Sequence, residues 1–234
     1  MEKVIHYIDS NTNLTFAARY QLKEQIKNLR NSNNFLRDSL KLYTSENFYI
    51  FNRTMRQIEL GVARVSFLIG PMYYSMIRFL YSNKSNYLLN RDTILYRTIW
   101  ANEYNLNNFY MSKPNIICFP SFSSSSFNKD FKTTNNAKIV NNITEDDIKV
   151  IMKLKYFHNN NVPIGMILKE FSIAQHESEV LLFPFTFIRV DDLNKVNEKY
   201  YELEGTIINK DCILEFGLKV GKKIILKNGI LTFE

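Results

Sequence analysis

The chain has 234 residues, of which 45% are hydrophobic and 14% aromatic, and it carries a formal net charge of +7. That length suits one domain, or a domain with an appended arm, and is enough to bury a sizeable core. The positive charge permits an acidic partner, but the basic residues are scattered and their densest run is only Lys219 to Lys227. Nucleic-acid binding would need a tight basic patch with interleaved aromatics, so nucleic acid is not an expected partner.

Cysteine content and hydropathy exclude two further classes of protein. Two cysteines, Cys118 and Cys212, cannot form the disulfide framework of a small secreted domain. We expect two reduced, buried thiols, and a single bridge between them is the alternative. The first ten residues are polar and lack the apolar core of a signal peptide. No run reaches the ~20 apolar residues that a membrane helix needs. We therefore expect a soluble protein of a reducing compartment, with no membrane span.

The first 90 residues carry apolar side chains at helical spacing and predict three helices. Asn11 or Thr12 caps the first helix, Ser45 caps the second, and Pro71 suits the first turn of the third. We expect the apolar stripes to pack in the core: Leu14, Ala18, Leu22, Ile26 and Leu29 in the first helix, Phe48, Phe51, Met55 and Ile58 in the second, and Met72, Met76, Phe79 and Leu80 in the third.

From Thr93 onward, short apolar runs bounded by Asn, Pro and Ser predict strands instead. A helical lobe thus precedes a strand-rich lobe, which makes the fold class α+β. The final strand follows a two-residue Asn-Gly turn, typical of a β-hairpin. The predicted strands are Ile94 to Ile99, Asn115 to Phe119, Val150 to Tyr156, Gly165 to Phe171, Val180 to Val190, Cys212 to Leu218, Lys223 to Leu226 and the segment after Asn228-Gly229.

Several familiar catalytic patterns are missing from the sequence. It has no Gly-rich phosphate loop, no GxGxxG and no nucleophile elbow. The three histidines, His6, His158 and His176, do not have metal-ligand spacing, so no metal is expected.

Arg97 lies towards the end of a predicted buried strand. A buried charge is costly unless it is paired, so Arg97 needs an anionic partner. Taken alone, the residue suggests a structural salt bridge. The alternative is a guanidinium fork that holds a phosphate or a ribose.

A serine run follows the next strand, from Ser123 to Ser126. Hydroxyls at alternate positions of an extended segment share one face, so Ser124 and Ser126 point the same way, into a cleft or against a neighbouring strand. Taken alone, the run suggests no more than a serine-rich loop.

Two carboxylates stand directly before a very apolar segment, at Glu177 and Glu179. If that segment is extended, both face the same side. Like charges so close resist simultaneous ionisation, so one carboxyl is protonated more readily or a cation lies between them. A solvated acidic loop is the simpler interpretation, but the apolar strand that begins at Val180 argues against it.

Together these residues resemble the Arg–Ser–Glu signature of the arginine-specific mono-ADP-ribosyltransferases, the family of vertebrate ecto-enzymes and many bacterial toxins. In that family an Arg closes an early strand, as in Leu95-Tyr96-Arg97. A later strand ends in Phe-x-Ser-Thr-Ser, matched by Phe122-Ser123-Ser124-Ser125-Ser126, and Glu-x-Glu opens a third, matched by Glu177-Ser178-Glu179. Tyr43-Thr44-Ser45 is similar to the family's tyrosine–threonine turn. The resemblance covers roughly Lys41 to Val190.

The resemblance implies a fold and a division of the chain. It implies an NAD-binding β core of two packed sheets at 93–234, preceded by a helical lobe at 41–92. These two parts make one catalytic domain at 41–234, with residues 1–40 as an N-terminal helical arm.

The resemblance also implies a role for each matched residue. Glu179 supports the ribosyl cation, and Ser124 holds Glu179 and the nicotinamide ribose. Arg97 clamps the dinucleotide, and Glu177 orients the incoming guanidinium. Four further residues are expected to contact NAD: Thr98, where the family often has Gly or Ala, together with Ser126, Phe127 and Phe131.

The expected activity is therefore transfer of ADP-ribose from NAD, as substrate, to a protein side chain, arginine by resemblance. The expected partners are NAD and an acceptor protein, in the cytoplasm or, for a toxin-like effector, in a host cytoplasm. Two alternatives remain open: an NAD glycohydrolase with the same Arg, Ser and Glu residues, and a basic binding module in which these residues are incidental.

Overall fold

The computed structural model describes residues 16–44, 87–103, 106, 116–119, 121–129, 146–158, 164–168, 178–183, 186–208, 224–227 and 230–233. The chain divides into two compact units. One comprises Met1–Asn86 with Glu170–Ala174, and the other comprises Tyr87–Lys169 with Gln175–Glu234. The domain boundaries expected from the sequence stay a prediction.

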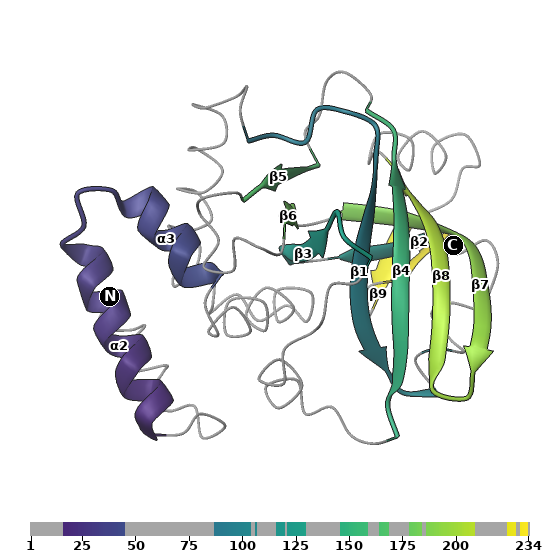
Figure 1. Ribbon diagram of the computed structural model, residues 1–234, viewed down its shortest axis with the longest axis horizontal. Helices are drawn as coiled ribbons and strands as arrows, with labels where there is room; N and C mark the ends of the chain where they lie inside the picture. Colours follow the sequence, from purple (N-terminus) through teal and green to yellow (C-terminus); the bar gives the residue numbers. More distant parts are fainter. Residues whose placement is uncertain are drawn as a thin grey trace. The chain divides into compact units, whose positions relative to one another are not determined.

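The described residues of the first unit form two helices, α2, Phe16–Arg30, and α3, Phe35–Tyr43 (Figure 1). The first predicted helix corresponds to α2, whose Ile26 and Leu29 are buried as its apolar stripe requires. No helix was predicted from the sequence at the position of α3. Asn34 caps α3 by accepting a hydrogen bond from the Arg37 N–H. The helices predicted to begin at Ser45 and Pro71 lie outside the described residues.

The second unit contains a mixed sheet, with ten strands among the residues described. Its spatial order is β5-β6-β3-β1-β4-β8-β7-β2-β10-β9 (Figure 1). Each neighbouring pair is antiparallel except β4 and β8, which are parallel. The strands are β1 Thr93–Ala101, β2 Ile116–Phe119, β3 Ser123–Ser126, β4 Ile148–Tyr156, β5 Gly165–Ile167, β6 Glu179–Leu182, β7 Thr186–Asn197, β8 Tyr200–Ile208, β9 Ile224–Lys227 and β10 Ile230–Phe233.

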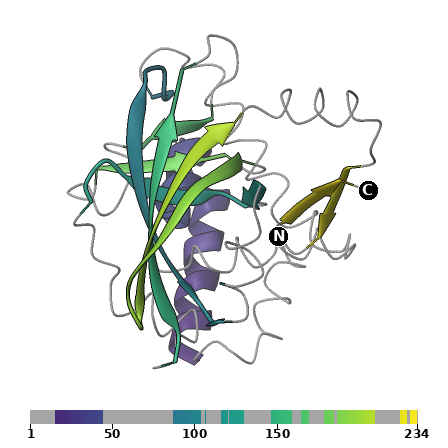
Figure 2. The ribbon, with the colours of Figure 1, turned by 90° about the vertical axis from the view of Figure 1, so that its right-hand side faces the viewer.

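Most predicted strands are confirmed, with one difference in how the chain is divided. The run from Val180 to Val190 forms two strands, β6 and β7, rather than one. The Thr186 hydroxyl donates to the Phe183 carbonyl at 2.6 Å and closes the connection between them. The hairpin predicted around Asn228-Gly229 is confirmed by the pairing of β9 with β10 (Figure 2). The strand predicted at Cys212 to Leu218 lies outside the described residues.

Two packed sheets were expected, and the hydrogen bonds do not show them. The described strands instead follow one continuous order, because β1 pairs with β3 on one side and with β4 on the other. Strand β1 therefore joins the short strands β3, β6 and β5 to the long strands β4, β8 and β7.

Alternation of side chains explains the long strands. Along β4, every second residue from Ile148 to Tyr156 is buried, and the residues between them are partly exposed. Strand β8, which the sequence reasoning missed, alternates in the same way, with Tyr201, Leu203, Gly205 and Ile207 buried. Gly205 is needed there because a Cβ would lie 2.7 Å from Ile188 Cγ2.

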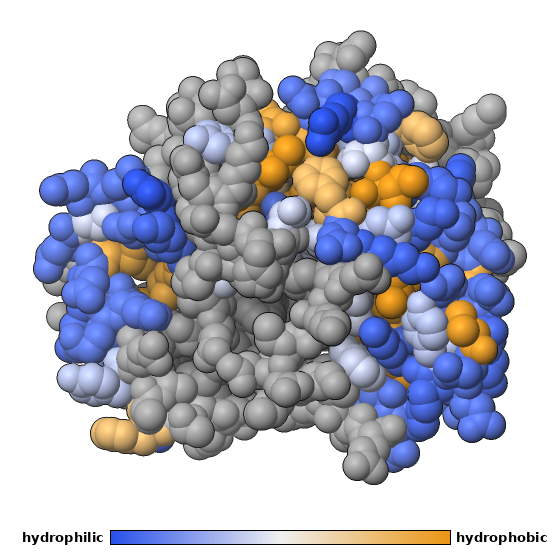
Figure 3. Space-filling model, viewed as in Figure 1, coloured by the Kyte–Doolittle hydropathy of each residue, from blue (hydrophilic) through white to orange (hydrophobic). Residues whose placement is uncertain are grey.

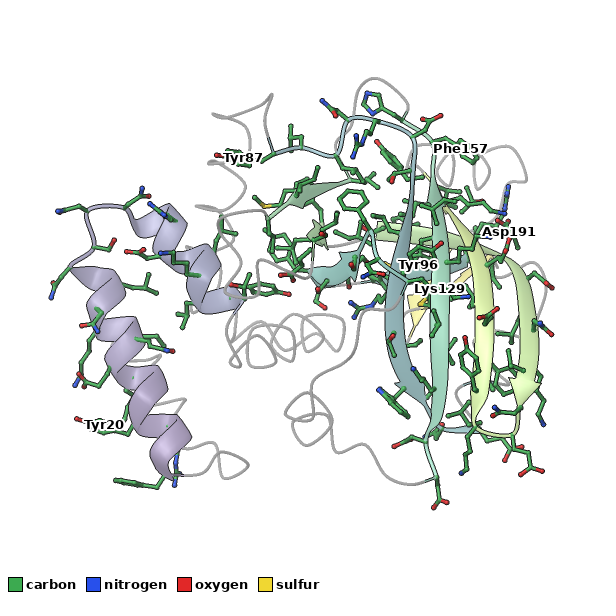
Figure 4. All side chains as sticks on the ribbon, in the orientation of Figure 1. Tyr20, Tyr87, Tyr96, Lys129, Phe157 and Asp191 are labelled. Atoms are coloured by element: carbon green, nitrogen blue, oxygen red, sulfur yellow. The ribbon has the colours of Figure 1, made fainter. Side chains whose placement is uncertain are left out.

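The opposite face of the long strands is largely hydrophilic over β4, β8 and β7 (Figure 3). Glu204 on β8 accepts hydrogen bonds from the ammonium groups of Lys153 and Lys155, each at 2.8 Å. Lys129, which follows β3 and is labelled in Figure 4, lies 3.1 Å from the Glu202 carboxylate. The segment after the serine strand thus reaches across the sheet to β8.

Candidate active site

Three adjacent strands carry the residues singled out from the sequence. Strand β3 lies between β1 and β6, with Ser126 opposite Tyr96 on one side and opposite Glu179 on the other. Since neighbouring strands are about 4.8 Å apart, the backbone at Glu179 lies roughly 10 Å from that of β1 beside Arg97. The fold therefore brings the Arg, Ser and Glu motifs together across two strand spacings.

Arg97 lies on the core side of β1. It is opposite Met152 of β4, which is fully buried, and it follows the alternation that buries Leu95. Its guanidinium donates a hydrogen bond from Nη1 to the Ser124 carbonyl and lies over the Phe119 ring, 5.2 Å from the ring centroid. These contacts hold the planar group between β2 and β3 and limit its rotation.

The serine strand is buried although it is polar. Ser126 is 1% exposed, and its Oγ accepts the Asn128 N–H at 2.9 Å. Ser125 Oγ is buried, and it has no hydrogen-bond partner within the described part of the chain. A polar group that is buried without a hydrogen bond lowers the stability of the fold, and such groups are rare in proteins. Ser124 and Ser126 face Leu181 and Glu179 in the register, so they share a face as expected.

Glu179 begins β6 and is 8% exposed. The strand pairing places it directly opposite Ser126, and its carbonyl accepts the Leu168 N–H at 2.9 Å. The backbone that carries this carboxylate is therefore fixed from both sides. Burial of an acidic side chain to this degree is unusual in proteins.

Ser178 alters the expectation for the two carboxylates. Its φ is +47°, the left-handed region, and its side chain is exposed. Glu177 and Glu179 were expected to face the same side only if the segment that carries them is extended. Ser178, which lies between them, is not extended. Glu177 itself lies outside the described residues.

The remaining predicted residues have separate surroundings. Thr98 is half-buried on β1, opposite Ile151. Phe127 is half-buried, packs against the apolar core, and lies under the Arg91 guanidinium, 5.8 Å from its ring centroid. Phe131 lies outside the described residues. The stacking of Phe127 or Phe131 on nicotinamide stays a prediction.

Two neighbours of the motif residues were not found from the sequence. Phe119 supports the Arg97 guanidinium, and Leu168 holds the backbone of Glu179. Neither carries a distinctive signal, because an aromatic or a leucine near a strand end is ordinary core composition.

The described residues contain no group of three His, Cys, Asp or Glu side chains placed to hold a metal ion. They also contain no helix that is long and apolar enough to span a membrane. Cys118 is buried and is not in a disulfide.

Comparison of the sequence with family models and with curated proteins gives no match. Comparison of the fold with solved structures does. The Vis toxin, an ADP-ribosyltransferase from Vibrio splendidus, superimposes with a TM-score of 0.53 at 14% identity, covering 99% of this chain and 100% of that one.

Two other ADP-ribosyltransferases are similar to the same degree. The eukaryotic mono-ADP-ribosyltransferase ART2.2 gives a TM-score of 0.54 at 18% identity, over 90% of this chain and 87% of that one. HopU1 of Pseudomonas syringae pv. tomato gives 0.53 at 11% identity, over 88% and 87%. Identities this low report on the fold, and the chain has the ADP-ribosyltransferase fold.

Proposed function

We propose that this chain transfers ADP-ribose from NAD to a protein side chain, arginine, and releases nicotinamide. One observation carries the proposal: in an ADP-ribosyltransferase fold, Arg97, the serine strand and buried Glu179 occupy three adjacent strands. Fold alone does not imply function, so the chemistry of these side chains must support the activity.

The reaction breaks the bond between the ribose C1′ and the nicotinamide nitrogen, and the electron pair leaves with nicotinamide. Positive charge then develops on the ribose, as it does in glycoside hydrolysis. A carboxylate held beforehand beside that centre lowers the barrier, because it need not reorganise as the charge forms. Glu179 suits this role, since its backbone is fixed by Ser126 and Leu168.

Arg97 is the anchor for the dinucleotide in this proposal. A guanidinium presents its donors in one plane and binds phosphate or ribose oxygens through two of them at once. The Ser124 carbonyl and the Phe119 ring already fix the plane of the group. The Arg97 side chain therefore loses little further rotational freedom when NAD binds.

The serine strand positions the other two groups. Ser126 lies beside Glu179 in the register, and the Ser124 carbonyl contacts Arg97, so both ends of the site share one four-residue strand. We assign the Ser124 hydroxyl to holding Glu179 and the nicotinamide ribose. Thr98, Ser126, Phe127 and Phe131 complete the NAD-binding set.

The second part of the proposal is the identity of the acceptor, an arginine side chain. Its guanidinium nitrogen forms the new bond to C1′ and gives up a proton, for which Glu177 is the base. The crystal structure of Vis in complex with agmatine, itself a guanidine, supports an acceptor of this chemistry. The fold is shared with toxins, which supports an effector that modifies a host protein.

The test is incubation with NAD labelled in its adenylate half, together with agmatine or cell extract. The proposal expects labelled agmatine, a labelled protein band and release of nicotinamide. Glu177→Gln should lose transfer by about 10-fold or more and retain most NAD hydrolysis, because water needs less orientation than a guanidine. Brisk hydrolysis without transfer to any guanidine would favour the glycohydrolase, and absence of both would favour the binding module.

A further inference from the structure

Helix α2 exposes two large aromatic side chains. Phe16 is 79% exposed and Tyr20 is 59% exposed, and the Tyr20 side chain extends outward from the helix (Figure 4). Single exposed apolar residues are common on protein surfaces, but two rings one helical turn apart form a patch. Ile26 and Leu29 of the same helix are buried. The two aromatic rings are therefore not part of the packing that holds α2 in its unit.

The two aromatics begin a row of side chains along α2. Phe16, Tyr20, Lys23 and Lys27 follow one another at alternate spacings of four and three residues, so they lie along one side of the helix. The buried apolar residues lie along a different side. The exposed face of α2, which we define by these four residues, thus carries two rings followed by two ammonium groups.

The helix is also basic. It contains four basic residues, and its single acidic residue is Glu24. Glu24 pairs with Lys27 at 2.7 Å, but both side chains are more than a third exposed, and such a pair is weak in water. The first turn contains Arg19 and no acidic residue, although the helix dipole favours negative charge there. The end of α2 that bears the two rings is therefore attractive to anions.

We propose that the exposed face of α2 binds the surface of a membrane that contains anionic lipids. Aromatic rings favour the boundary between lipid headgroups and acyl chains, and lysine reaches the phosphates of that boundary on a long apolar stem. The helix lies on the membrane and does not cross it, because its 15 residues are fewer than the ~20 that a span needs. The inference goes beyond the proposed function and does not depend on NAD turnover.

An acidic protein is the other partner that the charge of α2 fits. The buried centre of a protein–protein interface is depleted in lysine, whereas on α2 two lysines continue the row that the aromatic rings begin. A lipid surface accepts both kinds of side chain side by side, since its apolar and anionic layers are adjacent. The arrangement of the row therefore favours the membrane.

The test is flotation of the whole protein with vesicles of two compositions. One is phosphatidylcholine alone, and the other contains phosphatidylcholine and phosphatidylserine at roughly 2:1. Binding should be at least about 10-fold stronger to the anionic vesicles, because each basic residue near such a surface contributes about 5-fold. Salt at about 0.5 M should remove most of this preference by screening the charges.

Variants of the exposed face separate the contribution of the rings from that of the charges. The double variant Phe16→Ser, Tyr20→Ser should bind anionic vesicles about 10-fold or more weakly, because it removes the apolar contact with the membrane. Lys23→Gln and Lys27→Gln should each weaken binding by about 5-fold. All of these side chains are at least partly exposed, so the thermal midpoint and the release of nicotinamide should stay at their wild-type values.

Two substitutions in the other unit provide matched controls. Phe157 is 61% exposed, much like Tyr20, and Lys199 is exposed before β8. Phe157→Ser and Lys199→Gln should therefore bind anionic vesicles as the wild type does. Equal losses in the control and α2 variants would show that any exposed ring or ammonium group serves, and would overturn the inference.

Three other results would overturn it as well. They are equal binding to the two kinds of vesicle, wild-type binding by the double aromatic variant, and absence of binding to either vesicle. In the last case, binding of polyglutamate by the wild type and not by the α2 lysine variants would assign the face to an acidic protein instead. A protein that binds anionic vesicles but turns over no NAD would refute only the proposed function, so the two failures are distinguishable.

Discussion

The long and short strands of the sheet are built on different principles. Strands β1, β4, β8 and β7 have 9 to 12 residues and place apolar side chains on one face. Strands β3, β6 and β5 have only 3 or 4 residues. Strand β3 is made entirely of serine, and β6 is buried along its whole length with Glu179 at its start.

The difference shows where stability comes from and where it is given up. The long strands bury a continuous apolar core on one face. On the other face they carry ion pairs such as those of Glu204 with Lys153 and Lys155. The short strands bury hydroxyls and a carboxylate, which lowers stability unless these groups are hydrogen-bonded or paired. Strand β1 belongs to both sets, and Arg97 lies where they meet. We therefore expect substitutions in the two regions to separate activity from stability.

The largest expected effect is on activity, in the short strands. Glu179→Gln should lower both transfer and NAD hydrolysis by ~10²–10³, because the amide supplies no charge to the developing cation. The thermal midpoint should be retained, since the amide has the same shape. Rates are measured by release of nicotinamide, with Glu198→Gln in the exposed turn before β8 as the matched control. More than about a tenth of wild-type turnover would remove Glu179 from its assigned role.

The next effect is on stability, in the long strands. Leu154 on β4 is fully buried opposite Leu95, so Leu154→Ala should cost ~2–5 kcal/mol of the free energy of unfolding. Denaturant titration measures it, and Ile151→Ala, on the half-buried face of the same strand, should cost only about 1 kcal/mol. NAD turnover per folded molecule should be unchanged. Loss of turnover by folded Leu154→Ala protein would show that the two regions are not separable.

Arg97→Lys tests the residue that both regions share. The charge survives, but lysine cannot present two donors in one plane, so affinity for NAD should fall by about 10-fold. Calorimetry with NAD or an inert analogue measures the affinity, and Arg189→Lys at an exposed position of β7 should leave it unchanged. Equal affinity for wild type and Arg97→Lys would make Arg97 a structural link between β1 and the Ser124 carbonyl.

The smallest effect is expected on the charged face of the long strands. The ammonium groups of Lys153 and Lys155 lower the pKa of Glu204 to about 2. Since the pKa is lower in the folded state, the contribution is present above the usual carboxyl range and is lost as the pH falls towards about 2. Salt screens such an exposed pair, so Glu204→Gln should shift the thermal midpoint only slightly and less in high salt.

The effect of Glu204→Gln on NAD turnover should differ sharply from that of Glu179→Gln. Glu204→Gln should keep NAD turnover within about twofold, as expected for a surface position away from the site. A large loss of turnover would place the face of β8 in the substrate path.

Regular apolar patterns could be predicted, and less regular ones could not. Strands β1, β2 and β4 and the final hairpin follow from runs of apolar residues with clear borders. Strand β8 was missed because Glu202, Glu204 and Gly205 break up the continuous run of apolar residues that marks the other predicted strands. Its side chains nevertheless alternate between buried and partly exposed positions. Helix α3 was missed because its cap, Asn34, lies in a polar segment that suggests a loop.

The sequence by itself marked out the residues to which we assign a role in the proposed reaction, since an arginine in an apolar strand, a run of serines and two carboxylates before a strand are unusual wherever they lie. Only the tertiary structure decided how they meet. Strand order set Ser126 between Tyr96 and Glu179, which no local pattern encodes because these pairings join distant segments. Ser178 likewise has a left-handed backbone, which its residue type does not favour.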